Sequence, residues 1–265
     1  MEVVQDSICA PATMGAQQTM QIYMKELKYE LTKLLRERSY IFSIFGFPIA
    51  FFVVFGLAND GQLFHGYPVT RYLIASYSCF GAMGAALFAI GGGLAAERGN
   101  GWLELKRASP MPIHAYLFSK LCASVLFAIT LALILLGIAS LSINLQMSVL
   151  DGLHFLLAVA GGAITFASLG VLMGLLMPAN AGGMINFVYL PLSLCGGLWM
   201  PLEMLPVWLQ QAAPLLPSYH YSRLTLHTLG YFNESEPKSW LILALYALVF
   251  SSIAAWLFRR QEATR

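Results

Sequence analysis

Charged residues are scarce in this chain of 265 residues, of which only 11% are Asp, Glu, Lys or Arg. Soluble domains contain about 25%. Intrinsic disorder is excluded because 58% of the residues are hydrophobic. Four cysteines are too few for a disulfide scaffold of this length, and a net charge of +2 gives no sign of nucleic-acid binding. The composition therefore predicts a chain surrounded largely by lipid.

Uncharged apolar runs of about 20 residues, enough to cross a bilayer core as helix, recur along the chain. The longest run is too long for one span and breaks at the Pro- and Gly-rich stretch 177–183. We expect an all-α integral membrane protein with six transmembrane helices, at about 40–58, 70–96, 114–141, 153–177, 183–200 and 239–258. A single membrane domain would cover 17–265, after a flexible cytoplasmic tail at 1–16.

The basic residues predict the orientation of these spans. With both termini in the cytoplasm, only Arg71, Arg223 and Lys238 of the 15 Lys and Arg residues lie outside. Cytoplasmic loops carry the excess of basic residues, so we expect this orientation. The expected location is a bacterial cytoplasmic (inner) membrane.

Three segments differ from simple spans. Residues 17–38 have helical amphipathic spacing, which predicts a helix lying in the membrane interface or, alternatively, a solvated helix packed on a partner. The charged loop 96–112 predicts a short helix across the cytoplasmic mouth; the alternative is a plain connecting loop. Four prolines divide 201–237 into pieces too short to cross, which predicts an outer re-entrant helical hairpin, or a loop resting on the outer surface.

Two of these segments contain motifs that together resemble the ABC-2 type transporter permease family over about residues 20–260. The loop contains Glu97-Arg98, Gly101, Glu104-Leu105, Ser109-Pro110 and, further on, Ser119-Lys120. The exit from the fifth span is Gly-rich and continues as a Pro-hydrophobic-x-x-Leu-Pro segment at 201–206, with Arg223 downstream. Trp102 departs from the family pattern, which usually has a small polar residue there.

The resemblance implies the membrane subunit of an ATP-driven exporter, working with a second copy of itself or a homologous permease and with two copies of a separate ATPase. ATP and Mg would be bound by that ATPase, because no phosphate-binding loop motif occurs in this chain. The chain itself would be no enzyme and would bind no cofactor or metal. The loop 97–112 would be the coupling helix that docks into the ATPase, through Glu97, Arg98, Gly101, Trp102, Glu104, Leu105, Arg107 and Pro110.

The spans contain no charged residue away from their ends, which argues against proton- or sodium-coupled transport. An apolar, aromatic interior suits a hydrophobic or amphipathic substrate such as a drug, antibiotic, peptide or lipid. The candidate path residues are Phe45, Phe47, Phe51 and Phe52 in the first span and Asn186, Phe187 and Tyr189 in the fifth. The alternative functions are a membrane sensor or sequestering subunit without export, and a membrane enzyme acting on lipid.

Small residues recur in the second span, at Gly81, Ala85, Ala89 and Gly93, and in the fourth span, at Ala163, Ala167, Gly170 and Gly174. Such residues let helix backbones approach closely in lipid. They predict packing seams within one subunit or, alternatively, between two subunits.

Overall fold

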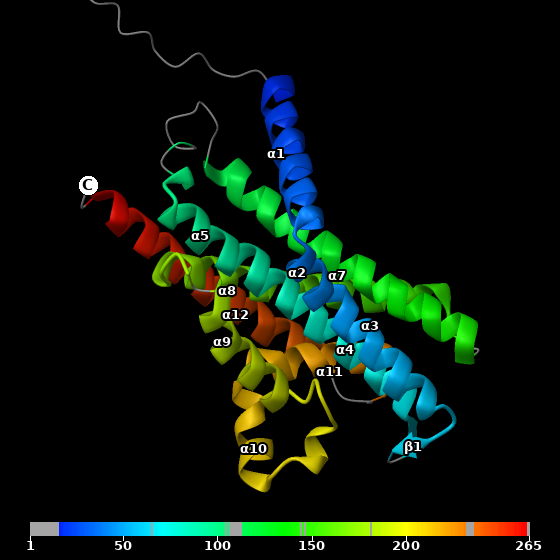
Figure 1. Cartoon of the computed structure of the whole chain (residues 1–265). Helices are drawn as coiled ribbons and strands as arrows, with labels where there is room; N and C mark the ends of the chain where they lie inside the picture. The colour runs from blue at the N-terminus through cyan, green and yellow to red at the C-terminus, as the bar shows by residue number, and fades with distance from the viewer. Residues whose placement is uncertain are drawn as a thin grey trace, which may run out of the picture.

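The computed structural model describes residues 16–64, 66–103, 105, 113–143, 145, 147–180, 182–231 and 236–263, and these form a helical bundle (Figure 1). The tail expected at 1–16 lies outside the described residues, apart from Ala16. Two short strands, β1 (Leu63–Phe64) and β2 (Tyr67–Pro68), pair in antiparallel orientation between the first two spans.

Five helical stretches are long and apolar enough to cross a membrane. The first combines α2 (Arg38–Ile41), η1 (Phe42–Gly46), α3 (Phe47–Phe51) and η2 (Phe52–Gly56). The second combines α4 (Val69–Ala86), η3 (Leu87–Gly92) and α5 (Gly93–Gly99). The others are α7 (Ile113–Ile143), α8 (Val149–Leu176) and α12 (Glu236–Ala263). All five correspond to expected spans.

The expected fifth span is shorter than the other five. It forms α9 (Gly182–Cys195), which has 14 residues and contains Pro191. At 1.5 Å per residue it is about 21 Å long, less than the roughly 30 Å of a bilayer core. Six spans therefore stay a prediction.

Three π-helical stretches, η1, η2 and η3, interrupt the first two spans. Pro48 lies near the start of α3, directly after η1. Because proline has no N–H, it cannot donate to the preceding helical turn, and a π-helical turn accommodates that gap.

The small-residue seams pack inside this one chain. A Cβ atom on Gly170 of α8 would lie 2.9 Å from the Ala86 carbonyl oxygen, and one on Gly174 would lie 2.8 Å from Leu94 Cβ. A Cβ atom on Gly81 would lie 2.0 Å from Leu131 of α7. The second span therefore contacts the third and fourth directly, which confirms the prediction of seams within one subunit.

The amphipathic helix α1 (Ala16–Arg36) packs along α7, at the opposite end of the molecule from α10 (Val207–Ala212) (Figure 1). Its Leu34 is buried in a cluster with Tyr40, Ile44 and Phe127. Met20, Met24 and Leu35 stay exposed on other sides of the helix. Helix α1 thus rests on the bundle by one narrow face.

The segment after α9 forms two 3-10 turns, η4 (Leu202–Met204) and η5 (Ala213–Leu215), together with α10 and α11 (Pro217–Thr228). Helix α11 packs against α4, α8 and α12. Its buried Tyr221 donates a hydrogen bond to the Val159 carbonyl at 2.8 Å. A Cβ atom on Gly162 would lie 2.0 Å from the Tyr221 ring, so glycine makes room for this contact. Prolines keep the pieces short, as the sequence predicts.

Candidate functional site

A cluster of charged side chains joins three helices at the end of the bundle that carries α1. Lys120 of α7 lies in the centre, with its Nζ 2.8 Å from Glu30 Oε1 of α1 and 3.1 Å from Glu97 Oε1 of α5. Lys33 of α1 pairs with the same Glu97 carboxylate and lies 3.8 Å from Glu30. Tyr116 of α7 donates its hydroxyl proton to Glu97 Oε2. We call Glu30, Lys33, Glu97, Tyr116 and Lys120 the charge cluster.

The centre of the charge cluster is deeply buried. Both Lys120 and Glu30 are 0% exposed. A buried ion costs several kcal/mol in lost hydration and is retained only when well-placed opposite charges repay that cost. Two carboxylates and two ammonium groups balance here, so the three helices are held in one mutual arrangement.

Lys33, which lies in α1 outside the spans, responds to this environment. Burial alone lowers the pKa of Lys33, but the carboxylates of Glu30 and Glu97 more than offset that effect. Its pKa is therefore raised above the ordinary value of 10.5. The ammonium form is the one that the cluster stabilises.

Arg98, the next residue after Glu97, reaches a fourth helix. Its guanidinium donates to the carbonyl of Leu175 and, at 2.6 Å, to the carbonyl of Met177. Both carbonyls lie at the C-terminal end of α8, where backbone acceptors are unpaired and the helix dipole favours a cation. The pair Glu97-Arg98 thus ties the end of the second span to α1, α7 and α8.

The loop predicted to be a coupling helix begins directly after this pair. Gly101 has φ of +75°, a left-handed conformation that favours glycine. Leu103 is buried beside Leu94 and Tyr116, whereas Trp102 is 53% exposed and Leu105 is also exposed. The predicted contacts Glu104, Arg107 and Pro110 lie outside the described residues. One leucine therefore anchors the loop and leaves apolar neighbours at the surface.

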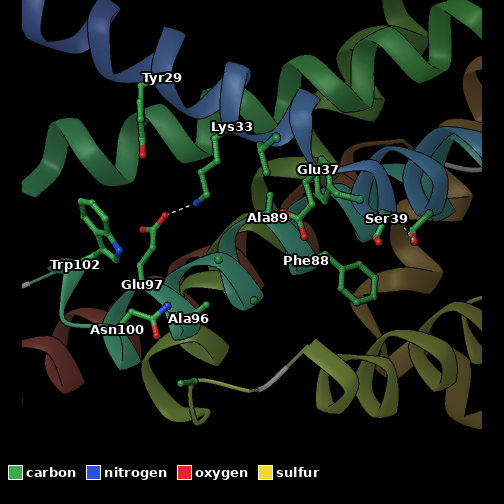
Figure 2. A pocket seen from close by; sticks show the side chains of 16 residues that line it. Tyr29, Lys33, Glu37, Ser39, Phe88, Ala89, Ala96, Glu97, Asn100 and Trp102 are labelled. Atoms are coloured by element: carbon green, nitrogen blue, oxygen red, sulfur yellow. Dashed lines mark hydrogen bonds and ion pairs between the residues drawn. The ribbon is translucent and has the colours of Figure 1, made fainter.

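A cleft of about 560 Å³ lies between α1 and η3–α5 (Figure 2). Lys33, Glu97, Asn100 and Trp102 line one end of it, and the Phe88 ring lies further along (Figure 2). The cleft thus has a charged part beside the loop and an apolar part beside the second span.

The side chains of Glu97 and Arg98 are bonded to other helices of the same chain. Their predicted contact with an ATPase stays a prediction. Sequence reasoning also missed Glu30, although it shares a helical face with Leu27 and Leu34. Lys120 appeared only as part of a motif, with no partner assigned.

The residues predicted to line the substrate path do not form one site. Phe51 lines an apolar cleft of about 390 Å³ at the other end of the bundle, beside Tyr77 and Trp199. Phe51 also stacks on Phe47, which lines the same cleft, with ring centroids 4.1 Å apart. Aromatic residues of two spans and the exit segment meet there.

The remaining path residues lie elsewhere. Phe52 is fully buried, Phe45 packs on Phe127 with centroids 5.6 Å apart, and buried Tyr189 donates to the Phe80 carbonyl at 3.0 Å. Asn186 and Phe187 are exposed on α9. Among the described residues, no group of three His, Cys, Asp or Glu side chains is placed to hold a metal.

Helices of this length and hydropathy define a multi-pass α-helical membrane protein. Residues 18–229 match the family described as ABC-2 type transporter, and the chain belongs to that family. The "Putative transport permease YvfS" of Bacillus subtilis (strain 168) is 28% identical over 246 residues, which cover 92% of this chain and 100% of that protein. The chain is thus a transport permease of the ABC-2 type.

Proposed function

We propose that this permease is the membrane subunit of an ATP-driven exporter for a hydrophobic or amphipathic substrate. Two copies, or one copy and a homologous permease, would assemble with two copies of a separate ATPase. The loop after Gly99 would face the cytoplasm together with both termini, in a bacterial inner membrane. Helix α9 would complete six spans, and α10 and α11 would form the outer re-entrant hairpin.

The observation that carries this proposal is the position of Glu97 and Arg98. They join the start of the surface loop to α1, α7 and α8 through ion pairs and hydrogen bonds. Since packed helices bonded in this way move together, a push on the loop is passed to several spans at once. The role of these two residues is then to position the spans, while Trp102 and Leu105 offer apolar contact to the ATPase.

The aromatic cleft supports the substrate class. Its lining is almost wholly apolar, with Phe, Tyr, Trp and Met side chains and one amide, that of Asn59. Its volume of about 390 Å³ is in the range of small-molecule sites. Such a surface binds apolar molecules with little selectivity, because burial of apolar surface is non-directional.

The decisive experiment reconstitutes the permease and its co-purifying ATPase in liposomes and measures ATP hydrolysis and uptake of apolar compounds. We expect the compounds to stimulate hydrolysis and Trp102→Ala to abolish transport while hydrolysis continues. The matched control is Trp208→Ala, because Trp208 is an exposed tryptophan on α10, at the opposite end of the molecule. Failure of any ATPase to bind, or normal transport by Trp102→Ala, would contradict the proposal.

A further inference from the structure

A groove of about 370 Å³ lies among α7, α8 and α12, away from both clefts described above. Helices α7 and α12 both pack along α8, so α8 forms the floor between them. Its walls include Leu117 and Leu121 of α7 and Val171 and Leu175 of α8. Each of these three helices is long and apolar enough to cross a membrane.

The groove faces the lipid on its α12 side. Only 11% of the most apolar part of α12 is buried in the chain, the smallest fraction among the five candidate spans. Ala255, on the groove side of α12, is exposed and leaves room where a larger side chain would fill the space. An acyl chain can therefore enter from the bilayer and lie along leucine and valine side chains.

The mouth of the groove is cationic. His114, at the start of α7, and Arg259, near the end of α12, are exposed and line the groove at the end of the bundle that carries the charge cluster. The neighbouring Arg260 is directed elsewhere, with its guanidinium 5.4 Å from the Trp256 ring centroid. Of these two adjacent arginines, Arg260 thus contacts an aromatic ring and Arg259 lines the groove.

We propose that this groove is a binding site for an anionic phospholipid. One acyl chain lies between α7 and α12 on the floor of α8, and the phosphate accepts hydrogen bonds from Arg259 and His114. Basic pockets between spanning helices bind anionic head groups through their opposite charge. Arginine suits this role, since its planar guanidinium matches phosphate oxygens in a paired geometry. The groove shares Leu103 with the base of the predicted coupling loop, but lipid binding there does not depend on the proposed export activity.

The test is native mass spectrometry of the purified permease equilibrated with equal amounts of phosphatidylglycerol and phosphatidylcholine. We expect wild-type protein to retain phosphatidylglycerol preferentially. Arg259→Gln should lower that preference by about tenfold, the effect of one lost charge-assisted hydrogen bond. The matched control Arg260→Gln removes the same charge from the adjacent position and should keep the preference.

A second pair of variants tests the apolar part of the groove. Ala255→Trp fills the groove and should release both lipids, whereas Ile253→Trp adds the same bulk at an exposed position outside the groove lining. Equal retention of the two lipids by wild type, or equal effects of the two arginine variants, would overturn the proposal. So would unchanged binding in Ala255→Trp, or displacement of the lipid by an apolar transport substrate. Loss of ATPase binding or transport leaves these readouts unaffected, so the two proposals fail independently.

Discussion

The two ends of the bundle are stabilised by different interactions, ion pairs at one end and aromatic contacts at the other. At one end, Lys120 is bonded at fixed distances to carboxylates from two other helices, with no exposure to solvent. At the other end, Phe51, Tyr77, Phe80 and Trp199 meet around an open cleft through ring contacts. Ion pairs and hydrogen bonds demand one geometry, whereas apolar contacts tolerate several. The first end is suited to passing on a movement and the second to adapting to a ligand.

The largest expected effect comes from removing the central charge. Lys120→Met leaves Glu30 and Glu97 buried with Lys33 alone, and it should destabilise the fold by about 3–5 kcal/mol. SDS titration of the purified permease measures this loss. Lys28→Met, at an exposed lysine on α1, is the matched control and should have little effect.

A double variant sharpens the same point. Glu30→Gln combined with Lys120→Met removes opposite charges together and should be less destabilised than Lys120→Met alone. Additive effects of the two substitutions would show that Glu30 and Lys120 are not energetically coupled. The charged end would then not differ from the aromatic end in the way described.

A smaller effect is expected where a single side chain caps a helix. Arg98→Gln loses charged hydrogen bonds to the end of α8 and should cost about 2 kcal/mol. Arg36→Gln, at an exposed arginine of α1, serves as control. Equal unfolding curves for Arg98→Gln and wild type would mean that these carbonyl contacts do not stabilise the bundle.

The aromatic end should tolerate substitution better. Phe51→Leu keeps an apolar side chain in the cleft, and a stability loss below about 1 kcal/mol is expected. Binding of an apolar fluorescent probe should nonetheless weaken, whereas Phe187→Leu, at a residue 83% exposed on α9, should leave it unchanged. A loss of stability in Phe51→Leu as large as that in Lys120→Met would show that the aromatic end is no more tolerant than the charged end.

The smallest effect is a dependence on alkaline pH. Because the folded-state pKa of Lys33 lies above its ordinary value of 10.5, its contribution to stability is complete below that pH and is lost as pH rises through the raised pKa. The difference in unfolding midpoint between wild type and Lys33→Met should therefore shrink above about pH 10.5. A constant difference across that window would show that the Lys33 charge is not stabilised by its carboxylate neighbours.

Hydropathy predicted the long spans well, because burial in lipid demands uninterrupted apolar sequence. Hydropathy placed α4–α5 and α8 within a few residues, and the small-residue spacing of α8 predicted a packing seam without naming its partners, α4 and η3. It could not show that α9 ends after 14 residues. The apolar run continues past Cys195, but a turn with Gly197 in a left-handed conformation ends the helix.

The functional residues, too, were only partly predictable from the sequence. Motif reasoning identified Glu97, Arg98 and Trp102 by type and position, but it assigned Glu97 and Arg98 no partner within the chain. Orientation depends on which helices lie within reach, and the two lysine partners of Glu97 are 64 positions earlier and 23 positions later in the chain. Such long-range pairs leave no periodic signal in a single sequence.

The sequence by itself determined that the chain is a helical membrane protein, because scarce charges and long apolar runs admit few other solutions. It also determined where the charged loop leaves the second span. Only the tertiary structure decided that Glu30, Glu97 and Lys120 share one buried site, since burial of a charge depends on neighbours that distant segments supply. For the same reason, only the fold separated Arg259, which lines a groove between α7 and α12, from Arg260, which lies over a tryptophan ring.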